Sequence, residues 1–340
     1  MKFLKKVFSW IKNHKLKALG LFCLGSFLLL TATILTAWCV KIVMDNRIFS
    51  DYDATKISNA RIINSKDESN YVISTLVFKS QCTGRDVSVV SIVPKAEGRK
   101  PVVLFLYGLL MKAEFIKKYA KEFADAGLAV LVMENYDCGM RQGEMNFAGL
   151  STLKDTLKIS KKKEQIFREW IGFRYRNACA VTELRQLIDV VKKQADLDSN
   201  NIYAWGISLG VIVASNTGAI SPDIKKFIFT IGSADFSQFA AKTPIRKYFP
   251  SYARPFLPAL AAEILSPLDP VNTIGKLSPR PILFQDSSND DLVPRECTEK
   301  MYECAGLPKS RMWYKIGHMK PNKKEIRRAI KDGISWLKTN

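Results

Sequence analysis

The feature that most constrains this chain is an uncharged run of 23 residues, Ala18 to Val40. As a helix the run would span about 34 Å, enough to cross the roughly 30 Å hydrocarbon core of a bilayer. A cleaved signal peptide usually has an apolar region of only about 7–15 residues, and no small-x-small cleavage site follows here. Nothing more polar than Ser or Thr interrupts the run, which disfavours a buried helix of a soluble domain. We therefore predict an uncleaved transmembrane signal anchor over residues 18–43, with a cleaved signal peptide as the alternative.

Charged residues flank this run unequally. Six lysines and no acidic residue lie within residues 1–17, whereas Lys41 and Arg47 are the only basic residues close behind the run. Positive charge beside a membrane helix is retained on the cytoplasmic side. We therefore predict a single-pass protein of the cell membrane. Residues 1–17 form its basic cytoplasmic flank, and the chain from residue 44 onward is periplasmic or extracellular.

The cysteines argue mildly against that orientation. Cys297 and Cys304 lie on one expected helix, where seven residues separate them by about 10 Å, too far for a disulfide. The cysteines beyond the run are odd in number and lack a framework spacing: Cys82, Cys138, Cys179, Cys297 and Cys304. We expect them to be mostly unpaired, which would suit a reducing compartment. The charge asymmetry is the stronger signal, and we retain the orientation that it predicts.

Composition excludes several classes of protein. Of 340 residues 47% are hydrophobic, which provides a sizeable core and rules out a disordered chain, a collagen-like repeat or a disulfide-stapled mini-protein. The formal charge of +20 raises the question of a nucleic-acid partner. No recognition motif and no basic patch with interleaved aromatic residues is present, and we predict no nucleic-acid binding.

From residue 70 onward the pattern alternates between strands and helices, after a linker over residues 44–69. Tyr71–Ser80 and Val87–Val93 are rich in β-forming residues and predict a hairpin. The alternation that follows predicts a mostly parallel, doubly wound sheet in a single α/β domain over residues 70–340. Its expected strands are Pro101–Tyr107, Leu128–Glu134, Ile202–Gly206, Lys226–Gly232, Ile282–Gln285 and Met312–Ile316, and its expected helices include Phe115–Ala126 and Ala178–Gln194.

Three segments stand outside this alternation. Residues 137–177 and residues 235–268 are insertions that we expect either to cover a site as a lid or to form solvated surface excursions. The stretch 309–338 is strongly basic. It predicts a basic amphipathic helix that covers the sheet with its charges in water, and a contact with lipid headgroups is the alternative.

The chemistry centres on the motif Gly206-Ile207-Ser208-Leu209-Gly210. An expected strand precedes it and a helix-compatible run of small residues follows it. A sharp strand-to-helix turn needs glycine at both flanks so that the backbone can pack closely, and it exposes the serine hydroxyl above the sheet. At the start of a helix, free N–H groups also lie beside a developing oxyanion. The motif therefore predicts Ser208 as a nucleophile.

A serine hydroxyl requires a base, and the chain has only two histidines, His14 and His318. His14 precedes the uncharged run and lies across the predicted membrane from Ser208. His318 follows the last expected strand, beside Gly317, where such a base belongs. We predict that His318 is the general base.

An acidic residue that orients the imidazole is expected after the penultimate strand. Asp290 begins a D-x-x-V-P pattern there and is our choice. Asp291 is its neighbour and Asp286 lies closer to the strand end. Asp235, after the preceding strand, is the least favoured of the four.

Ser208, Asp290 and His318 occur in this order along the chain, each after an expected strand. In this the chain resembles the α/β-hydrolase superfamily. The chain is most similar to its dienelactone hydrolase, acetyl xylan esterase and prolyl-oligopeptidase-like branch. The resemblance covers about residues 70–338. It implies an oxyanion hole built from the backbone N–H groups of Leu209 and Leu109, and it implies no metal and no organic cofactor.

The resemblance implies two-step acyl transfer to water. Together with the expected anchor it predicts a membrane-anchored serine hydrolase of carboxylic esters. The aromatic insertions favour acyl or lipid-like ester substrates. A serine peptidase or an acyltransferase would share the same residues. From a different class, a catalytically silent, membrane-anchored binding module with this fold is a further alternative, which the intact residues disfavour.

Overall fold

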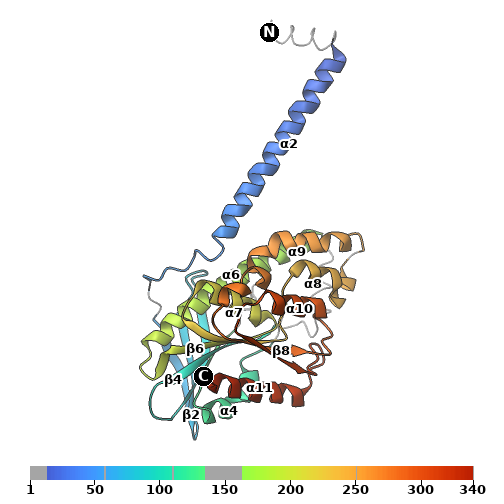
Figure 1. Cartoon of the computed structure of the whole chain (residues 1–340). Helices are drawn as coiled ribbons and strands as arrows, with labels where there is room; N and C mark the ends of the chain where they lie inside the picture. Colours follow the sequence, from blue (N-terminus) through green and yellow to red (C-terminus); the bar gives the residue numbers. More distant parts are fainter. Residues whose placement is uncertain (1–13, 57–58, 109–110, 135–162, 250, 340) are drawn as a thin grey trace. The chain divides into compact units, whose positions relative to one another are not determined.

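The computed structural model describes residues 14–56, 59–108, 111–134, 163–249 and 251–339. The chain divides into two compact units (Figure 1). Residues up to Ile48 form the first unit, and residues from Phe49 onward form the second.

The first unit is helix α2, Lys15–Asn46. Its segment Leu19–Asn46 is long and apolar enough to cross a membrane, judged by length and composition, and its large apolar side chains are exposed. Thr31, Thr33 and Thr36 donate their hydroxyls to backbone carbonyls three or four residues earlier. These hydroxyls need no water, so the helix is compatible with apolar surroundings.

The second unit contains one sheet, formed by nine strands in the described part of the chain. Their order is β1-β2-β3-β5-β4-β6-β7-β8-β9. The pairs β1–β2, β2–β3 and β3–β5 are antiparallel, and all pairs from β4–β5 to β8–β9 are parallel. The strands are β1 Arg61–Asp67, β2 Tyr71–Lys79, β3 Asp86–Pro94, β4 Lys100–Leu106, β5 Ala129–Met133, β6 Leu197–Ile207, β7 Ile224–Thr230, β8 Ile282–Ser287 and β9 Lys309–Tyr314. The predicted hairpin and the mostly parallel sheet are confirmed.

Helices cover both faces of this sheet, with α4 and α11 on one face and α6, α7 and α10 on the other (Figure 1). The helices of the unit are α3 Glu114–Lys117, α4 Ala120–Asp125, α6 Lys163–Lys193, α7 Leu209–Ile220, α8 Phe236–Lys242, α9 Leu257–Leu265, α10 Arg295–Cys304 and α11 Lys323–Lys338. Short 3₁₀ turns are η2 Pro244–Tyr248, η3 Arg254–Phe256, η4 Ser266–Leu268, η5 Pro270–Asn272 and η6 Ile274–Leu277. Because both faces are covered, β5 is buried at every residue, as its continuous apolar sequence predicts.

The core of the sheet includes Trp205 of β6, one of its largest fully buried side chains. Its ring contacts the rings of Phe105 and Phe123, and its indole N–H donates to Thr230 Oγ1 at 3.0 Å. Helix α11 approaches this ring so closely that a Cβ on Gly333 would lie 2.3 Å from it. The basic C-terminal helix is therefore seated on the sheet through its apolar face, with Ile330, Ile334 and Leu337 buried.

Several boundaries differ from the sequence-based expectation. Strand β1 lies inside the range 44–69, which was expected to be a linker. The sequence did not predict this strand, because an edge strand with every residue exposed has no alternating apolar pattern. The single helix expected over Phe115–Ala126 is two short helices, α3 and α4. Helix α6 begins at Lys163, within the expected insertion 137–177, of which residues 137–162 lie outside the described residues. The second insertion, 235–268, holds α8, η2, η3, α9 and η4 between β7 and β8.

The expectation of mostly unpaired cysteines was wrong for Cys82 and Cys179. These two form a disulfide with a Cα–Cα distance of 5.4 Å across 97 residues of sequence, and it joins the β2–β3 turn to α6. Pairing depends on tertiary proximity, which cysteine spacing does not reveal. Cys297 and Cys304 share α10 and are free, as expected, while Cys138 lies outside the described residues.

Candidate active site

The nucleophile candidate lies at the sharp turn between β6 and α7. Strand β6 ends at Ile207, α7 begins at Leu209, and Ser208 between them has a φ of 51°. A Cβ on Gly206 would lie 2.7 Å from the backbone of Gly210, and a Cβ on Gly210 would lie 2.1 Å from the Leu106 carbonyl oxygen. Both flanking positions therefore require glycine. Positive φ at a non-glycine residue is strained, and such strain persists where the surroundings impose it.

The base candidate follows β9. His318 Nε2 lies 2.9 Å from Ser208 Oγ, although 110 residues separate the two in sequence. A tight turn brings the histidine there, because a Cβ on Gly317 would lie 2.4 Å from the Lys320 carbonyl oxygen. The structure thus joins the serine and the histidine that the sequence singled out.

The third partner is Asp290, in the loop between β8 and α10. Its Oδ2 lies 3.0 Å from His318 Nδ1. Its Oδ1 accepts the backbone N–H groups of Leu292 and Val293 at 2.9 and 2.8 Å. The side chains of His318 and Asp290 are only 10% and 8% exposed. When Nδ1–H donates to the carboxylate, Nε2 presents its lone pair to the serine hydroxyl, the tautomer that a general base requires.

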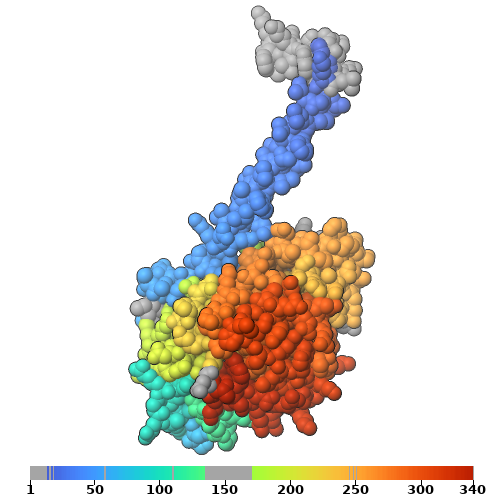
Figure 2. All heavy atoms as spheres, viewed as in Figure 1, coloured from blue at the N-terminus to red at the C-terminus, as the bar shows by residue number. Residues whose placement is uncertain are grey.

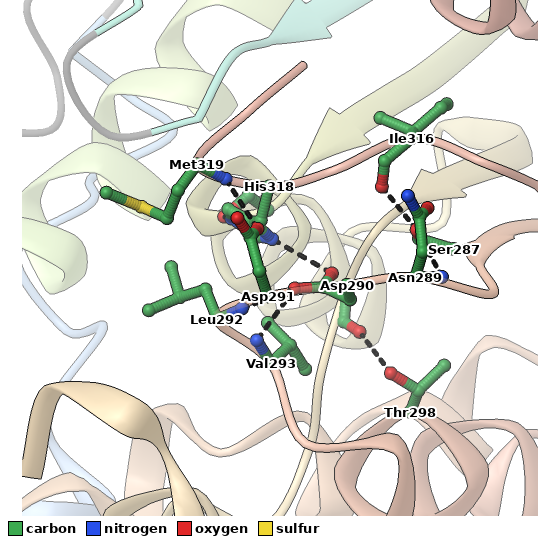
Figure 3. Close-up of polar contacts among 12 residues, drawn as sticks. Ser287, Asn289, Asp290, Asp291, Leu292, Val293, Thr298, Ile316, His318 and Met319 are labelled. Atoms are coloured by element: carbon green, nitrogen blue, oxygen red, sulfur yellow. Dashed lines mark hydrogen bonds and ion pairs between the residues drawn. The ribbon is translucent and has the colours of Figure 1, made fainter. Parts of the chain in front are cut away.

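Contacts between the two loops hold His318 in place (Figure 3). The Ser287 hydroxyl donates to the Ile316 carbonyl, and the Ser288 N–H donates to the Tyr314 carbonyl. Beyond the histidine, the Met319 N–H donates to Asp291 Oδ1 at 2.7 Å. The histidine loop is therefore fixed on both sides by the loop that carries Asp290.

The three competing acids have other partners. Asp286 lies within β8 and accepts from Arg311 Nε at 2.6 Å, and burial raises the pKa of its carboxyl to about 7 despite that arginine. Asp291 accepts from the Met319 backbone, as described above. Asp235 is the N-cap residue just before α8 and accepts the Gln238 N–H at 2.9 Å. Of the four candidates, Asp290 is the one that hydrogen-bonds to the imidazole of His318.

The structure describes one of the two residues predicted to form an oxyanion hole. Leu209 is the first residue of α7, and the first N–H groups of a helix have no partner within the helix. Leu109 lies outside the described residues. Its neighbour Gly108 is so close to the nucleophile that a Cβ there would lie 3.2 Å from Ser208 Cβ, and its N–H donates to Met111 Sδ at 3.3 Å. Sequence reasoning missed Met111, since no local pattern marks it.

Among the described residues, no group of three or more His, Cys, Asp or Glu side chains is placed to hold a metal ion. The described geometry offers a hydroxyl, an imidazole and a carboxylate in a hydrogen-bonded series. That series is suited to nucleophilic acyl transfer.

Comparison with known proteins shows that the chain is similar to esterases. No family model matches the chain. Esterase YjfP of Escherichia coli (strain K12) is 25% identical over 205 residues, which cover 58% of this chain and 71% of the esterase. The acetyl xylan esterase from Paenibacillus sp. R4 superposes with a TM-score of 0.63 at 16% identity and covers 88% of this chain and 93% of its own.

A second solved enzyme superposes on this chain equally well. Acetyl xylan esterase 1 from Thermoanaerobacterium sp. JW/SL YS485 has a TM-score of 0.62 at 17% identity, with 88% of this chain and 94% of that chain covered. The prediction of an ester hydrolase agrees with the names of all three relatives. The predicted fold and resemblance are confirmed: the chain is an α/β-hydrolase by fold and resembles the esterases of that superfamily.

Proposed function

We propose that this protein is a membrane-anchored serine hydrolase that cleaves carboxylic esters, with acyl or lipid-like esters as its favoured substrates. The observation that carries the proposal is the hydrogen-bonded series from Ser208 through His318 to Asp290. The esterase relatives support the reaction type. The apolar helix α2 supports the membrane attachment.

The reaction begins with attack of Ser208 Oγ on the ester carbonyl carbon, while the hydroxyl proton passes to His318 Nε2. Asp290 accepts from Nδ1 and stabilises the imidazolium that forms. The Leu209 N–H, with a second N–H that we assign to Leu109, donates to the oxyanion.

The tetrahedral intermediate then collapses. His318 returns its proton to the leaving alcohol as the carbon–oxygen bond breaks, which leaves an acyl group on Ser208. Water attacks this acyl-enzyme by the same route and releases the acid. Every proton in the cycle moves between Ser208, His318, the alcohol and water.

Labelling with a fluorophosphonate probe tests the nucleophile. The full chain should be modified, because the probe reacts with an activated serine, and the Ser208→Ala variant should not be. Thr217→Ala, on the same helix, is a matched control that should label like wild type. Equal labelling of wild type and Ser208→Ala would refute the assignment. A panel of acyl esters, acetylated sugars and peptide amides then ranks substrates by kcat/KM.

We also propose that the second unit faces the periplasm or the cell exterior. The lysine-rich flank supports this orientation, and so does the Cys82–Cys179 disulfide, since disulfides persist in oxidising compartments. In intact cells or spheroplasts, added protease should digest the second unit. Protection of that unit until the membrane is permeabilised would reverse the orientation.

A further inference from the structure

The insertion between β7 and β8 presents an apolar outer surface. Helix α9 buries Leu257, Ala261, Ile264 and Leu265 on its inner side. Its outer side carries Leu260, which is 38% exposed, and Phe256, one helical turn earlier at the end of η3, is 64% exposed. Tyr252, just before the helix, is 54% exposed. Large apolar side chains that gather on an exposed face often mark an interaction site, so this face requires an explanation.

The exposed residues form one continuous surface, which we call the α9 surface: Tyr252, Phe256 and Leu260. Together with Ala253, Ala259 and Glu263 they line an open hollow of about 530 Å³. Glu263 is the only charged residue of that lining, and residues 255–262 contain no charge. The segment lies at the outside of the second unit (Figure 2).

Basic residues border this surface. Arg254 follows the lining residue Ala253, and its guanidinium donates to the backbone carbonyls of Phe249 and Lys247, which ties the η2 turn to this segment. Lys247 itself is exposed there. An apolar surface with a basic border matches a lipid interface, where apolar side chains enter the acyl boundary and cations meet anionic headgroups.

The chain's connectivity favours a lipid surface over a soluble partner. Helix α2 ends at Asn46, and Phe49 already packs against the core of the second unit. The chain from Asn46 to Phe49 extends at most about 10 Å. A bilayer that holds α2 is therefore always within reach of the second unit. Tethering of this kind raises the effective concentration of a second contact to about the millimolar range, so a small apolar surface suffices.

The position of the insertion in the fold connects this surface to the site. The insertion leaves the sheet after Thr230, the last residue of β7, whose carbonyl accepts the Ser208 N–H at 2.9 Å. It therefore begins at the same edge of the sheet as the nucleophile. The basic helix α11 covers the other face from α7 (Figure 1), and its exposed outer residues are charged apart from Ser335, which suits water.

We propose that the α9 surface rests on the lipid of the bilayer that holds α2. Hydrolysis of esters carried in that bilayer then requires this contact, whereas hydrolysis of water-soluble esters does not. This proposal rests on the proposed membrane anchoring and ester hydrolysis. The contact adds to the anchor: α2 holds the chain in the membrane, and the α9 surface sets which side of the second unit meets the lipid.

Photo-crosslinking in the full chain tests the contact directly. A benzophenone amino acid replaces Phe256 in one sample and Leu307, which is 70% exposed and precedes β9 at the opposite sheet edge, in the other. In vesicles of phosphatidylcholine with phosphatidylglycerol, the probe at 256 should form lipid adducts and the probe at 307 should not. Equal adducts at both positions, or none at 256, would overturn the proposal.

An activity ratio provides an independent test. The double variant Phe256→Asp with Leu260→Asp should hydrolyse a short, water-soluble ester like wild type and lose at least about tenfold on a long-chain ester embedded in the vesicles. Leu307→Asp should lose neither activity. An unchanged ratio between the two substrates would contradict the contact.

The two arms separate failure of this inference from failure of the proposed function. If wild type cleaves neither ester, the proposed hydrolase function fails, while the crosslinking result still decides the contact. If wild type cleaves both esters through Ser208 and the double variant behaves identically, the function stands and the α9 surface has no role in docking.

Discussion

Two carboxylates four residues apart, at the end of β8 and in the loop behind it, occupy very different surroundings. Asp286 is enclosed within the sheet against Arg311, which also pairs with Glu299 and lies over the ring of Trp313. Asp290 lies in the loop, where its two oxygens accept backbone N–H groups and the imidazole of His318.

The difference teaches that surroundings rather than residue type select the acid of such a site. In Asp286 desolvation dominates and raises the carboxyl pKa to about 7, even with a guanidinium beside it. A carboxylate that stabilises an imidazolium must stay ionised during the reaction. The burial of Asp286 opposes that ionised form. Asp290 is instead the carboxylate that lies 3.0 Å from His318 Nδ1.

The largest expected effect is on catalysis. Asp290→Asn should lower kcat by about 10⁴-fold, because an amide at Nδ1 favours the wrong imidazole tautomer. Asp286→Asn should cost far less, since its nearest charged partner is Arg311 and not the imidazole. Steady-state kinetics of the full chain on one soluble ester compares the two. The reverse order would transfer the role of the acid to Asp286.

The next effect is on stability as a function of pH. The folded state holds the Asp286 proton up to about pH 7, whereas the unfolded chain releases it near the ordinary value of 3.8. Between these values the folded state binds more protons, so the stability that this residue contributes falls as the pH rises. The free energy of unfolding of wild type, measured against Asp286→Asn, should therefore decrease from about pH 4 to pH 7 and then level off.

Chemical denaturation across this pH range, followed by tryptophan fluorescence, measures that difference. The exposed Asp196, replaced by Asn, is the matched control. A wild-type stability that increases relative to Asp286→Asn between pH 4 and 7 would show that the Arg311 pair outweighs burial.

The smallest expected effect concerns Asp291, which accepts the backbone N–H of Met319 beside the histidine. Asp291→Ala removes the acceptor for the Met319 N–H and should lower kcat by about fivefold with little change in KM, the loss of one exposed hydrogen bond. Asp291→Asn keeps a carbonyl oxygen there and should recover most of the rate. If both variants are equally impaired, charge rather than the hydrogen bond is what Asp291 supplies.

Much of the fold was predictable because its signals are local. The apolar runs of the central strands, the glycines around Ser208 and the position of His318 after the last strand each depend on a few neighbouring residues. Strand β1 was missed because an exposed edge strand has no buried face to impose a pattern. Met111, which meets Gly108 beside Ser208, has no marker in its own sequence context.

By itself, the sequence determined the apolar helix, the α/β alternation and the serine and histidine of the candidate site, since backbone geometry and the scarcity of histidine limit the choices. Only the tertiary structure placed Asp290, rather than its three competitors, within hydrogen-bond distance of His318, paired Cys82 with Cys179 and left the α9 surface exposed. These outcomes depend on distances between residues far apart in the chain. Such distances exist only after the sheet has brought its strand ends and loops together.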